Sequence, residues 1–270
     1  MSFIVFPALL GLCAKTAGAR PDYQRLFQDR DACFLLVELQ TNRQVTEHNV
    51  ALCDERRSPY STFKIPASLM AFNEGVFKDE RQVIPWDGVK RGRAEIDQDL
   101  TPLSFMSASA KWVTEWLMPQ IGRAKIGTYL QDFKYGNEDF GGGLKDAWVS
   151  STLQISAREQ IDFLKRLWRH ELKVSKKAAE QTRAVMKIEV AKGLGFELWG
   201  KTGTGCVRGH TCLKESAPMF GWFVGVVRKG ERDYIFAGHA KDLKPQKAPG
   251  GPRQRDTTIE ILRHIDFGVK

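Results

Sequence analysis

The hydrophobic pattern starts with two strand-like runs, Ala32–Gln40 and Val45–Leu52, on either side of a polar turn at Asn42-Arg43. Between these runs and the last quarter of the chain, apolar residues recur at helical spacing. This spacing predicts helices at Ser61–Val76, Ser109–Ile121, Ala124–Phe133, Ser156–Trp168 and Ser175–Ile188. The residues between the first two helices, which include Pro85, Gly88, Gly92 and Pro102, are expected to form a loop.

Strand-like runs return late in the chain, at Phe196–Lys201, Met219–Arg228 and Asp233–His239, and a last helix is predicted at about Asp256–Ile265. We expect the late strands to complete the sheet that the early hairpin begins. Most of the helices between them must then pack against that sheet as a lobe. The pattern therefore predicts an α+β fold with a helical lobe packed against an antiparallel sheet.

Composition supports a globular protein with a large core. The chain has 270 residues, of which 42% are hydrophobic and 27% charged. These values exclude a disordered tail, a collagen-like rod and a polytopic membrane protein. Lys+Arg 41 against Asp+Glu 32 gives a net charge of +9, which favours anionic partners. The basic residues form no run interleaved with aromatics, so we expect no nucleic-acid partner.

The amino end resembles a secretory signal. The apolar run Phe3–Ala14 is shorter than the about 20 residues that span a bilayer, and small residues follow it at Thr16–Ala19. This predicts a signal peptide at 1–19, a single mature domain at 20–270, and a periplasmic or secreted protein. No Lys or Arg precedes the run, so a truncated start or a buried strand remains an alternative. Leu12 is too large for the position before the cysteine of a lipoprotein box.

Four cysteines would remain after cleavage. In the predicted hairpin Cys33 lies almost opposite Cys53, and Cys206 and Cys212 flank a short loop. Two disulfides are one interpretation, and four buried thiols are the other. No Cys or His spacing typical of zinc is present, so no metal is predicted.

A candidate nucleophile stands at the start of the first predicted helix, in Ser61-Thr62-Phe63-Lys64. Three residues make almost one helical turn, so Ser61 and Lys64 share a face. A serine hydroxyl is a weak nucleophile and needs a base, and an amine serves only if its pKa is lowered or if it is modified. The motif alone is also compatible with a helix cap beside an exposed lysine.

A second motif, Lys201-Thr202-Gly203, ends a strand-like run and is followed by Thr204 and Gly205. An exposed Lys and Thr on a strand edge can bind a carboxylate by charge and hydrogen bonds, and glycines permit close backbone approach. The alternative is an ordinary strand-to-turn junction. The segment does not match the phosphate-loop pattern GxxxxGK[ST].

Between the two motifs lie three more short elements. They are Ser109-Ala110-Lys111, Tyr135-Gly136-Asn137 before three glycines, and Trp148. The ordered set, with the flanking Ile65-Pro66 and Gly221-Trp222-Phe223-Val224-Gly225, resembles the class D, or oxacillinase-type, serine β-lactamases. The similarity covers roughly residues 30–265. It implies the penicilloyl-serine transferase fold, a helical lobe against an antiparallel sheet flanked by helices.

The resemblance implies a role for each motif residue. Ser61 would attack the β-lactam carbonyl, and Lys64, carboxylated by CO2 to N6-carboxylysine, would be the general base; no other cofactor is implied. Trp148 would donate a hydrogen bond to the carbamate, and Ser109 would pass a proton toward the leaving nitrogen. The backbone N–H groups of Ser61 and Thr204 would form the oxyanion hole. The carboxylate of the β-lactam would meet Lys201, Thr202, Gly203 and an arginine, for which Arg253 is weakly preferred over Arg255.

The chain departs from the family pattern at Lys111, where Ser-x-Val would place a valine. Its ammonium either points toward Lys64, where it would affect the carbamate, or bends to solvent. Ser107-Ala108-Ser109 is a rival alignment of this motif. The predicted function is hydrolysis of small-molecule β-lactams through a serine acyl-enzyme. The alternative is a penicillin-binding protein or β-lactam sensor domain that is acylated but deacylates slowly.

Overall fold

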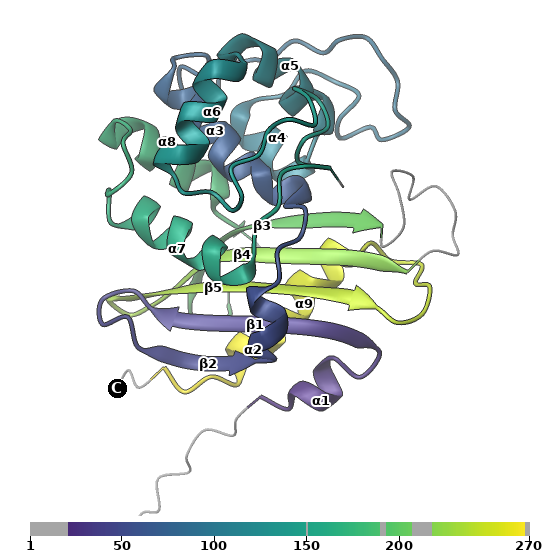
Figure 1. Cartoon of the computed structure of the whole chain (residues 1–270), viewed down its shortest axis with the longest axis vertical. Helices are drawn as coiled ribbons and strands as arrows, with labels where there is room; N and C mark the ends of the chain where they lie inside the picture. The colour runs from purple at the N-terminus through teal and green to yellow at the C-terminus, as the bar shows by residue number, and fades with distance from the viewer. Residues whose placement is uncertain (1–20, 150, 190–192, 207–217, 268–270) are drawn as a thin grey trace, which may run out of the picture.

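A computed structural model describes residues 21–149, 151–189, 193–206 and 218–267. Within these ranges the chain builds a five-stranded antiparallel sheet in the order β2-β1-β5-β4-β3 (Figure 1). The late strands complete the sheet that the early hairpin begins, because β1 pairs with both β2 and β5. The predicted α+β fold is confirmed. The strands are β1 (Arg30–Glu38), β2 (Gln44–His48), β3 (Glu197–Cys206), β4 (Met219–Lys229) and β5 (Arg232–Asp242).

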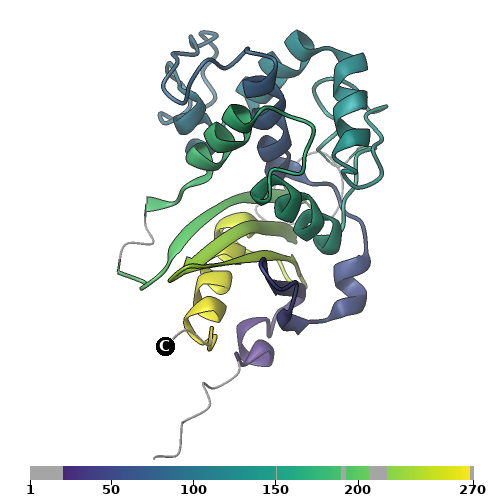
Figure 2. The same cartoon turned by 90° about the vertical axis from the view of Figure 1, so that its left-hand side faces the viewer.

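Both faces of the sheet are covered, so the molecule has three layers (Figure 2). On β1, Cys33 and Leu35 belong to the core shared with the helical lobe, whereas Phe34 and Leu36 pack with α9 (Gly250–Arg263). This is the two-residue alternation of a strand. Burial on both faces explains the long apolar runs in β1, β4 and β5.

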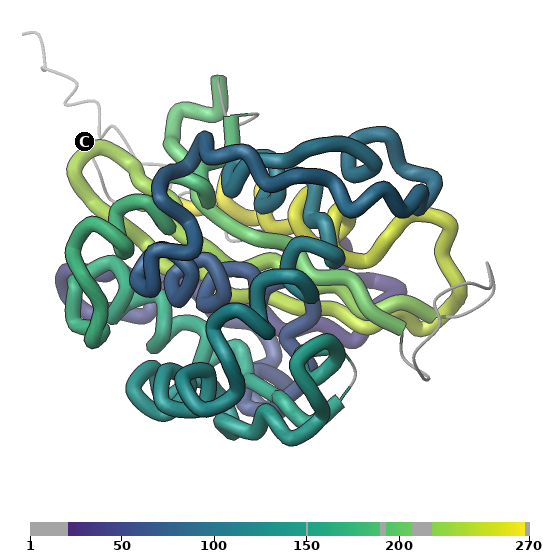
Figure 3. The backbone as a smooth tube through the Cα atoms, turned by 90° about the horizontal axis from the view of Figure 1, so that it is seen from above, coloured from purple at the N-terminus to yellow at the C-terminus, as the bar shows by residue number. Residues whose placement is uncertain are grey.

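The helical lobe covers one face of the sheet (Figure 3). Serine and threonine caps begin several of its helices: Ser156 and Thr101 form capping boxes, and Ser175 accepts the N–H of Ala178. These caps fix where each helix starts. The elements between the early and late strands are α2 (Val50–Asp54), the 3-10 helix η1 (Tyr60–Phe63), α3 (Lys64–Asn73), α4 (Pro102–Ala108), α5 (Lys111–Ile121), α6 (Arg123–Asp132), α7 (Ala157–Trp168) and α8 (Lys176–Met186).

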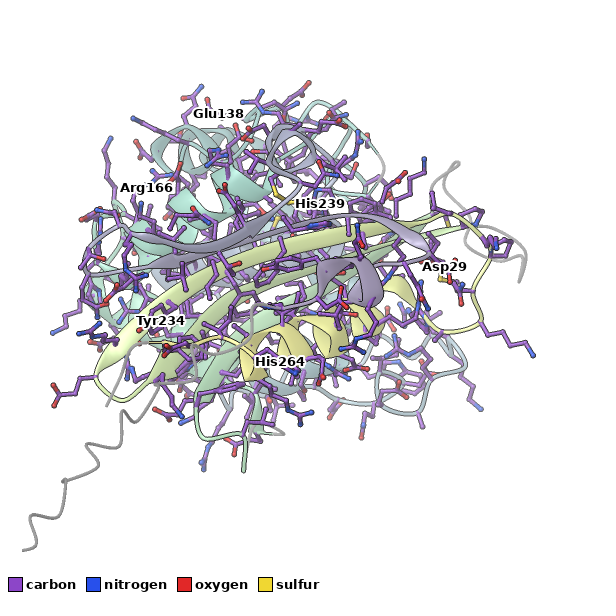
Figure 4. The ribbon with its side chains drawn as sticks, turned by 90° about the horizontal axis from the view of Figure 1, so that it is seen from below. Asp29, Glu138, Arg166, Tyr234, His239 and His264 are labelled. Carbon is purple, nitrogen blue, oxygen red and sulfur yellow. A yellow bond between two sulfur atoms is a disulfide. The ribbon has the colours of Figure 1, made fainter. Side chains whose placement is uncertain are left out.

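The other face carries α9 and the short α1 (Tyr23–Leu26). Figure 4 labels two residues of β5 that lie five positions apart and therefore point to opposite faces. Tyr234 packs on the α9 side and donates to the Phe267 carbonyl at 2.9 Å. His239 packs on the opposite side, against the rings of Phe220 and Trp222.

Several predicted boundaries were wrong. Strand β3 continues to Cys206, so Lys201-Thr202-Gly203 lies within the strand and not at its end. The second strand ends at His48, because Asn49 caps α2 over part of the range assigned to that strand. Helix α4 lies in the stretch expected to be a loop, since Pro102 occupies the first helical turn, where proline is favoured. Helix α9 begins six residues early, with glycines that pack closely on the sheet.

Cys33 and Cys53 form the predicted disulfide, although Cys53 lies on α2 rather than on a strand. Cys206 is also disulfide-bonded. Its predicted partner Cys212, and the predicted signal peptide at 1–19, lie outside the described residues. Among the residues that the structure describes, no helix has the length and apolar character needed to cross a membrane.

Candidate active site

Ser61 lies where η1 presses against β3. A Cβ added to Gly205 would lie 1.9 Å from the Tyr60 ring, and one added to Gly203 would lie 3.4 Å from the backbone nitrogen of Ser61. Glycine at position 205 therefore leaves the space that the Tyr60 ring fills, and at position 203 a Cβ would lie 3.0 Å from the Pro59 carbonyl oxygen, tighter than most Cβ contacts. The Tyr60 N–H also donates to the Trp148 carbonyl at 2.9 Å. Strand β3 and the Trp148 loop therefore fix the turn that carries Ser61.

Lys64 is the immediate neighbour of Ser61. Its Nζ lies 3.3 Å from the Ser61 Oγ and 5.5 Å from the centre of the Phe105 ring, and the residue is only 1% exposed. Burial, followed by the positive charges of Lys201 and Lys111, holds the pKa of Lys64 well below its usual value. The amine therefore gives up its own proton more readily than an exposed lysine does, as a base for the Ser61 hydroxyl must.

Lys201 is the second buried lysine, 4% exposed on β3. It faces the helical lobe, as does Val224, its partner on β4. Burial, with the charges of Arg93 and Arg255, lowers the pKa of Lys201 to about 7. Thr204, on the other side of the strand, accepts the Gly251 N–H at 2.9 Å and so joins β3 to the start of α9.

Trp148 is buried and stacks on Phe63, with ring centres 5.2 Å apart. The loop before it is closed by Asn137, which donates to the Thr152 carbonyl at 2.8 Å and accepts the Gln154 N–H at 2.9 Å. Gly136, at φ +61°, has no room for a side chain, because a Cβ would lie 2.0 Å from the Gln154 carbonyl oxygen. Tyr-Gly-Asn thus shapes the loop that delivers Trp148 to the ring of Phe63.

Ser109 lies in the tight turn between α4 and α5, in the left-handed region at φ 58°. It stands between Phe105, which contacts Lys64, and Lys111, whose charge acts on Lys64. The rival Ser107 is exposed and donates to the Ser104 carbonyl within α4. Ser109 thus occupies the turn between the two helices, whereas the Ser107 hydroxyl is bound within α4.

The possibility that the Lys111 ammonium points toward Lys64 is contradicted. Its Nζ lies 2.5 Å from Glu115 and 3.4 Å from Asp146, and its side chain is 47% exposed. Burial lowers the pKa of Lys111, but the hydrogen bonds and charges of Glu115 and Asp146 outweigh burial and leave it raised. Glu115 lies one helical turn along α5, and its ion pair with the Lys111 ammonium holds this side chain at the surface.

The two candidate arginines of α9 point in different directions. Arg253 forms an ion pair with the buried Asp242 of β5 and donates to the Ala248 carbonyl. Arg255 lies one turn beyond Gly251, the residue that contacts Thr204, and its charge acts on Lys201. The structure thus places Arg255, not the preferred Arg253, within electrostatic reach of Lys201.

Sequence reasoning missed Arg93. This residue comes from the loop between α3 and α4, and its charge acts on both Lys64 and Lys201. Its Nη2 donates to the Ala108 carbonyl at 3.0 Å, beside Ser109. A lone arginine in a glycine-containing loop gave no signal that could have identified it.

The chain matches known proteins over almost its whole length. Residues 34–262 match the family model described as penicillin binding protein transpeptidase domain. β-Lactamase OXA-1 of Escherichia coli is 34% identical over 99% of this chain and 98% of its own length. The probable β-lactamase YbxI of Bacillus subtilis is 33% identical over 88% of this chain and 82% of its own.

Solved structures agree with these relatives. A class D β-lactamase from Bacillus subtilis superposes with a TM-score of 0.80 at 30% identity, covering 94% of this chain and 99% of that one. The C-terminal domain of the Bacillus licheniformis BlaR penicillin receptor gives a TM-score of 0.80 at 29% identity, covering 90% and 94%.

The sheet, the lobe and the Ser61–Lys64–Lys201 cluster define a serine acyl-transferase, and the chain belongs to the penicillin-binding protein transpeptidase domain family. Within this family it is a class D β-lactamase, as the relatives and the structural neighbours show.

Proposed function

We propose that this chain hydrolyses β-lactams through an acyl-enzyme on Ser61, as its class D relationship implies. The observation that carries the proposal is the buried Lys64 amine, whose Nζ lies 3.3 Å from the Ser61 Oγ and whose pKa burial lowers. As the Ser61 Oγ bonds to the carbonyl carbon, its proton passes to the base at position 64. The lactam C–N bond then breaks, and the leaving nitrogen takes a proton by way of Ser109.

The oxyanion would be bound by two backbone N–H groups, those of Ser61 and Thr204. The close approach of Gly203 to the Ser61 nitrogen supports this pairing, because it brings the two backbones together at the nucleophile. Such donors are fixed before reaction and so stabilise developing charge without reorganisation. They require no side chain.

The ring carboxylate would bind at Lys201, Thr202 and Gly203 of β3. We assign the accompanying arginine to Arg255, because its charge already acts on Lys201, whereas Arg253 is committed to Asp242. A guanidinium binds a carboxylate through paired hydrogen bonds.

The residues around Lys64 fit carboxylation of its amine by CO2. The amine is buried and its pKa is lowered, which favours the unprotonated form that reacts with CO2, and the charges of Lys201 and Lys111 would stabilise an anion there. When present, the carbamate supplies an anionic base at neutral pH for acylation and for deacylation. Trp148 would donate its indole N–H to it, since its ring stacks on Phe63, the residue before Lys64.

Export to the periplasm or medium is part of the same proposal. The Cys33–Cys53 disulfide supports it, because such bonds persist in oxidising compartments and are rare in the cytosol.

Nitrocefin turnover, measured with and without added bicarbonate, tests hydrolysis and carboxylation together. We expect multiple turnovers that rise with bicarbonate. Ser61→Ala should abolish labelling by a fluorescent penicillin and reduce turnover by on the order of 10⁶-fold, whereas Ser107→Ala should retain both. Stoichiometric labelling without turnover would instead indicate a receptor like the BlaR domain. Labelling of the Ser61→Ala protein would refute the nucleophile.

A further inference from the structure

The loop that carries Arg93 is held rigidly against the helical lobe. The Asp97 carboxylate accepts the backbone N–H groups of Arg91, Gly92 and Arg93 at 2.9, 2.9 and 3.2 Å. The Ile96 carbonyl accepts the buried indole N–H of Trp112 on α5 at 3.0 Å. Arg93 therefore has a defined starting position, which a binding residue needs if it is not to lose entropy when the ligand arrives.

The guanidinium of Arg93 is anchored on one side only. Its Nη2 donates to the Ala108 carbonyl at 3.0 Å and its Nε donates to Glu95 at 2.9 Å. A guanidinium has five N–H donors, so these contacts leave donors for a ligand. The side chain is 48% exposed, which leaves it accessible from water.

Arg93 and Arg255 approach Lys201 from different layers of the molecule. Arg93 comes from the lobe and Arg255 from α9, beyond the opposite face of the sheet (Figure 2). The ring carboxylate of a β-lactam is assigned above to Lys201 and Arg255. Arg93 is a further cation beside the same site, because it is bound to the Ala108 carbonyl at the end of α4, the helix whose Phe105 ring lies 5.5 Å from the Lys64 Nζ.

We propose that Arg93 forms a second anion-binding position, which selects β-lactams whose acyl side chain carries its own carboxylate or sulfonate. The inference rests on the proposed function, since it names a substrate class for the same site. Arg93 acts by direct contact: the guanidinium binds the second anion in paired hydrogen bonds, in competition with the exposed Glu95.

The test compares carbenicillin with benzylpenicillin, which differ by one carboxylate on the acyl side chain. The quantity measured is the ratio of their second-order acylation rate constants, which exists for a hydrolase and for a slowly deacylating receptor alike. In Arg93→Gln the ratio should fall about tenfold, because only carbenicillin loses a contact with a second carboxylate, whereas an effect of the Arg93 charge on Lys64 or Lys201 changes both rate constants and cancels in the ratio. In Arg93→Lys the ratio should fall by less than about threefold, because lysine keeps the positive charge but lacks the paired N–H donors of the guanidinium.

Arg91→Gln is the matched control. Arg91 lies two residues away in the same loop, but it is paired with Asp87 and lies over the Trp112 ring. Arg91→Gln removes one positive charge, as Arg93→Gln does. We expect its ratio to equal that of the parent. An equal fall in Arg91→Gln would show a general field effect, and an equal fall for both penicillins in Arg93→Gln would show a role only in holding the Ala108 turn. Either result overturns the proposal. Absence of nitrocefin turnover bears on the proposed function alone.

Discussion

Lys64 and Lys201 are both buried, and burial is the main reason that the pKa of each lies below that of an exposed lysine. The charge of Lys201 lowers the pKa of Lys64 further, whereas the charges of Arg93 and Arg255 act on Lys201 and its pKa falls to about 7. The lowered pKa suits Lys64 to proton transfer, and Lys201 keeps its positive charge for anion binding below about pH 7.

The pKa of Lys201 predicts how substrate binding depends on pH. Because this pKa is lowered to about 7, Lys201 is a cation below pH 7 and loses its charge above it. The KM for a penicillin should therefore rise between pH 6 and pH 9, by up to about tenfold if the lost contact contributes about 1.4 kcal/mol. Steady-state kinetics across this range measures it.

Lys201→Arg provides the comparison, since a guanidinium stays charged throughout this range. Its KM should be nearly constant with pH, whatever its absolute value. If the variant shows the same rise as the parent, the titrating group is not Lys201.

The placement of Lys111 leads to a second prediction. Its charge is partly neutralised by Glu115 and Asp146, and water screens exposed pairs. Lys111→Val should therefore shift the bicarbonate concentration for half-maximal turnover by less than about threefold. A larger shift, titrated with nitrocefin in CO2-depleted buffer, would mean that the ammonium turns inward in solution.

At the scale of elements, the contact between η1 and β3 sets the position of the nucleophile. Gly205→Ala would push a methyl group into the Tyr60 ring and displace the turn that carries Ser61. We expect the acylation rate constant to fall about tenfold or more, as small misplacements of reacting groups do. Gly127→Ala is the control, because this position in α6 has open space and alanine is the better helix former.

Stopped-flow acylation and thermal unfolding separate the two variants. Gly127→Ala should keep the parental acylation rate and a melting temperature equal to or above the parent's. A Gly205→Ala protein that acylates normally would show that η1 does not depend on this close approach.

The order and type of most elements could be predicted from periodicity, because both sheet faces and one face of each long helix are buried. The predicted boundaries were wrong where a proline or glycine at a helix start matters more than the hydrophobic periodicity. Pro102 was counted as a helix breaker, although at the first turn it favours a helix. Helix α9 was predicted from Asp256, yet it begins at Gly250, and Gly250 and Gly251 pack closely on β4 and β3.

The site residues, too, could be predicted only in part. The spacing of Ser61 and Lys64 placed them on one helix face, and the family pattern indicated Lys201 and Thr204. Whether Arg253 or Arg255 faces Lys201 depends on where α9 begins and how it is rotated, which spacing alone does not fix. Arg93 reaches the site through the tertiary placement of its loop.

At the scale of the whole molecule, one buried imidazole makes stability depend on pH. His239 lies between the rings of Phe220 and Trp222 and contacts the Leu52 carbonyl (Figure 4). Burial lowers its pKa to about 3, while the Leu52 hydrogen bond raises it and the Arg57 charge lowers it further. In the unfolded chain its pKa is about 6.5.

The unfolded chain therefore binds the proton between pH 6.5 and 3, and the folded protein does not. Stability from this group is present above pH 6.5 and is lost as the pH falls. Its contribution to the free energy of unfolding should decrease by about 3 kcal/mol between pH 7 and pH 4. Urea unfolding at the two values, with disulfides intact, measures the change.

His239→Phe should reduce the acid loss by this amount, whereas His264→Gln, at an exposed position, should leave it unchanged. Other groups titrate over the same range, so the comparison between variants is the readout. An identical acid loss in the His239→Phe protein would contradict the assignment.

The position of β1 between β2 and β5 constrains the order in which the chain can fold. Its partner β5 is synthesised about 200 residues later, and Arg30 pairs with Asp242 in the finished sheet. Until then β1 has a partner on one edge only, and its other row of backbone groups is open to other chains. The helical lobe, built from nearby segments, can form while the ribosome is still extending the chain, whereas the sheet can close only near the end of synthesis. A variant that slows closure of β5 onto β1 should thus lower yield through aggregation before it lowers activity.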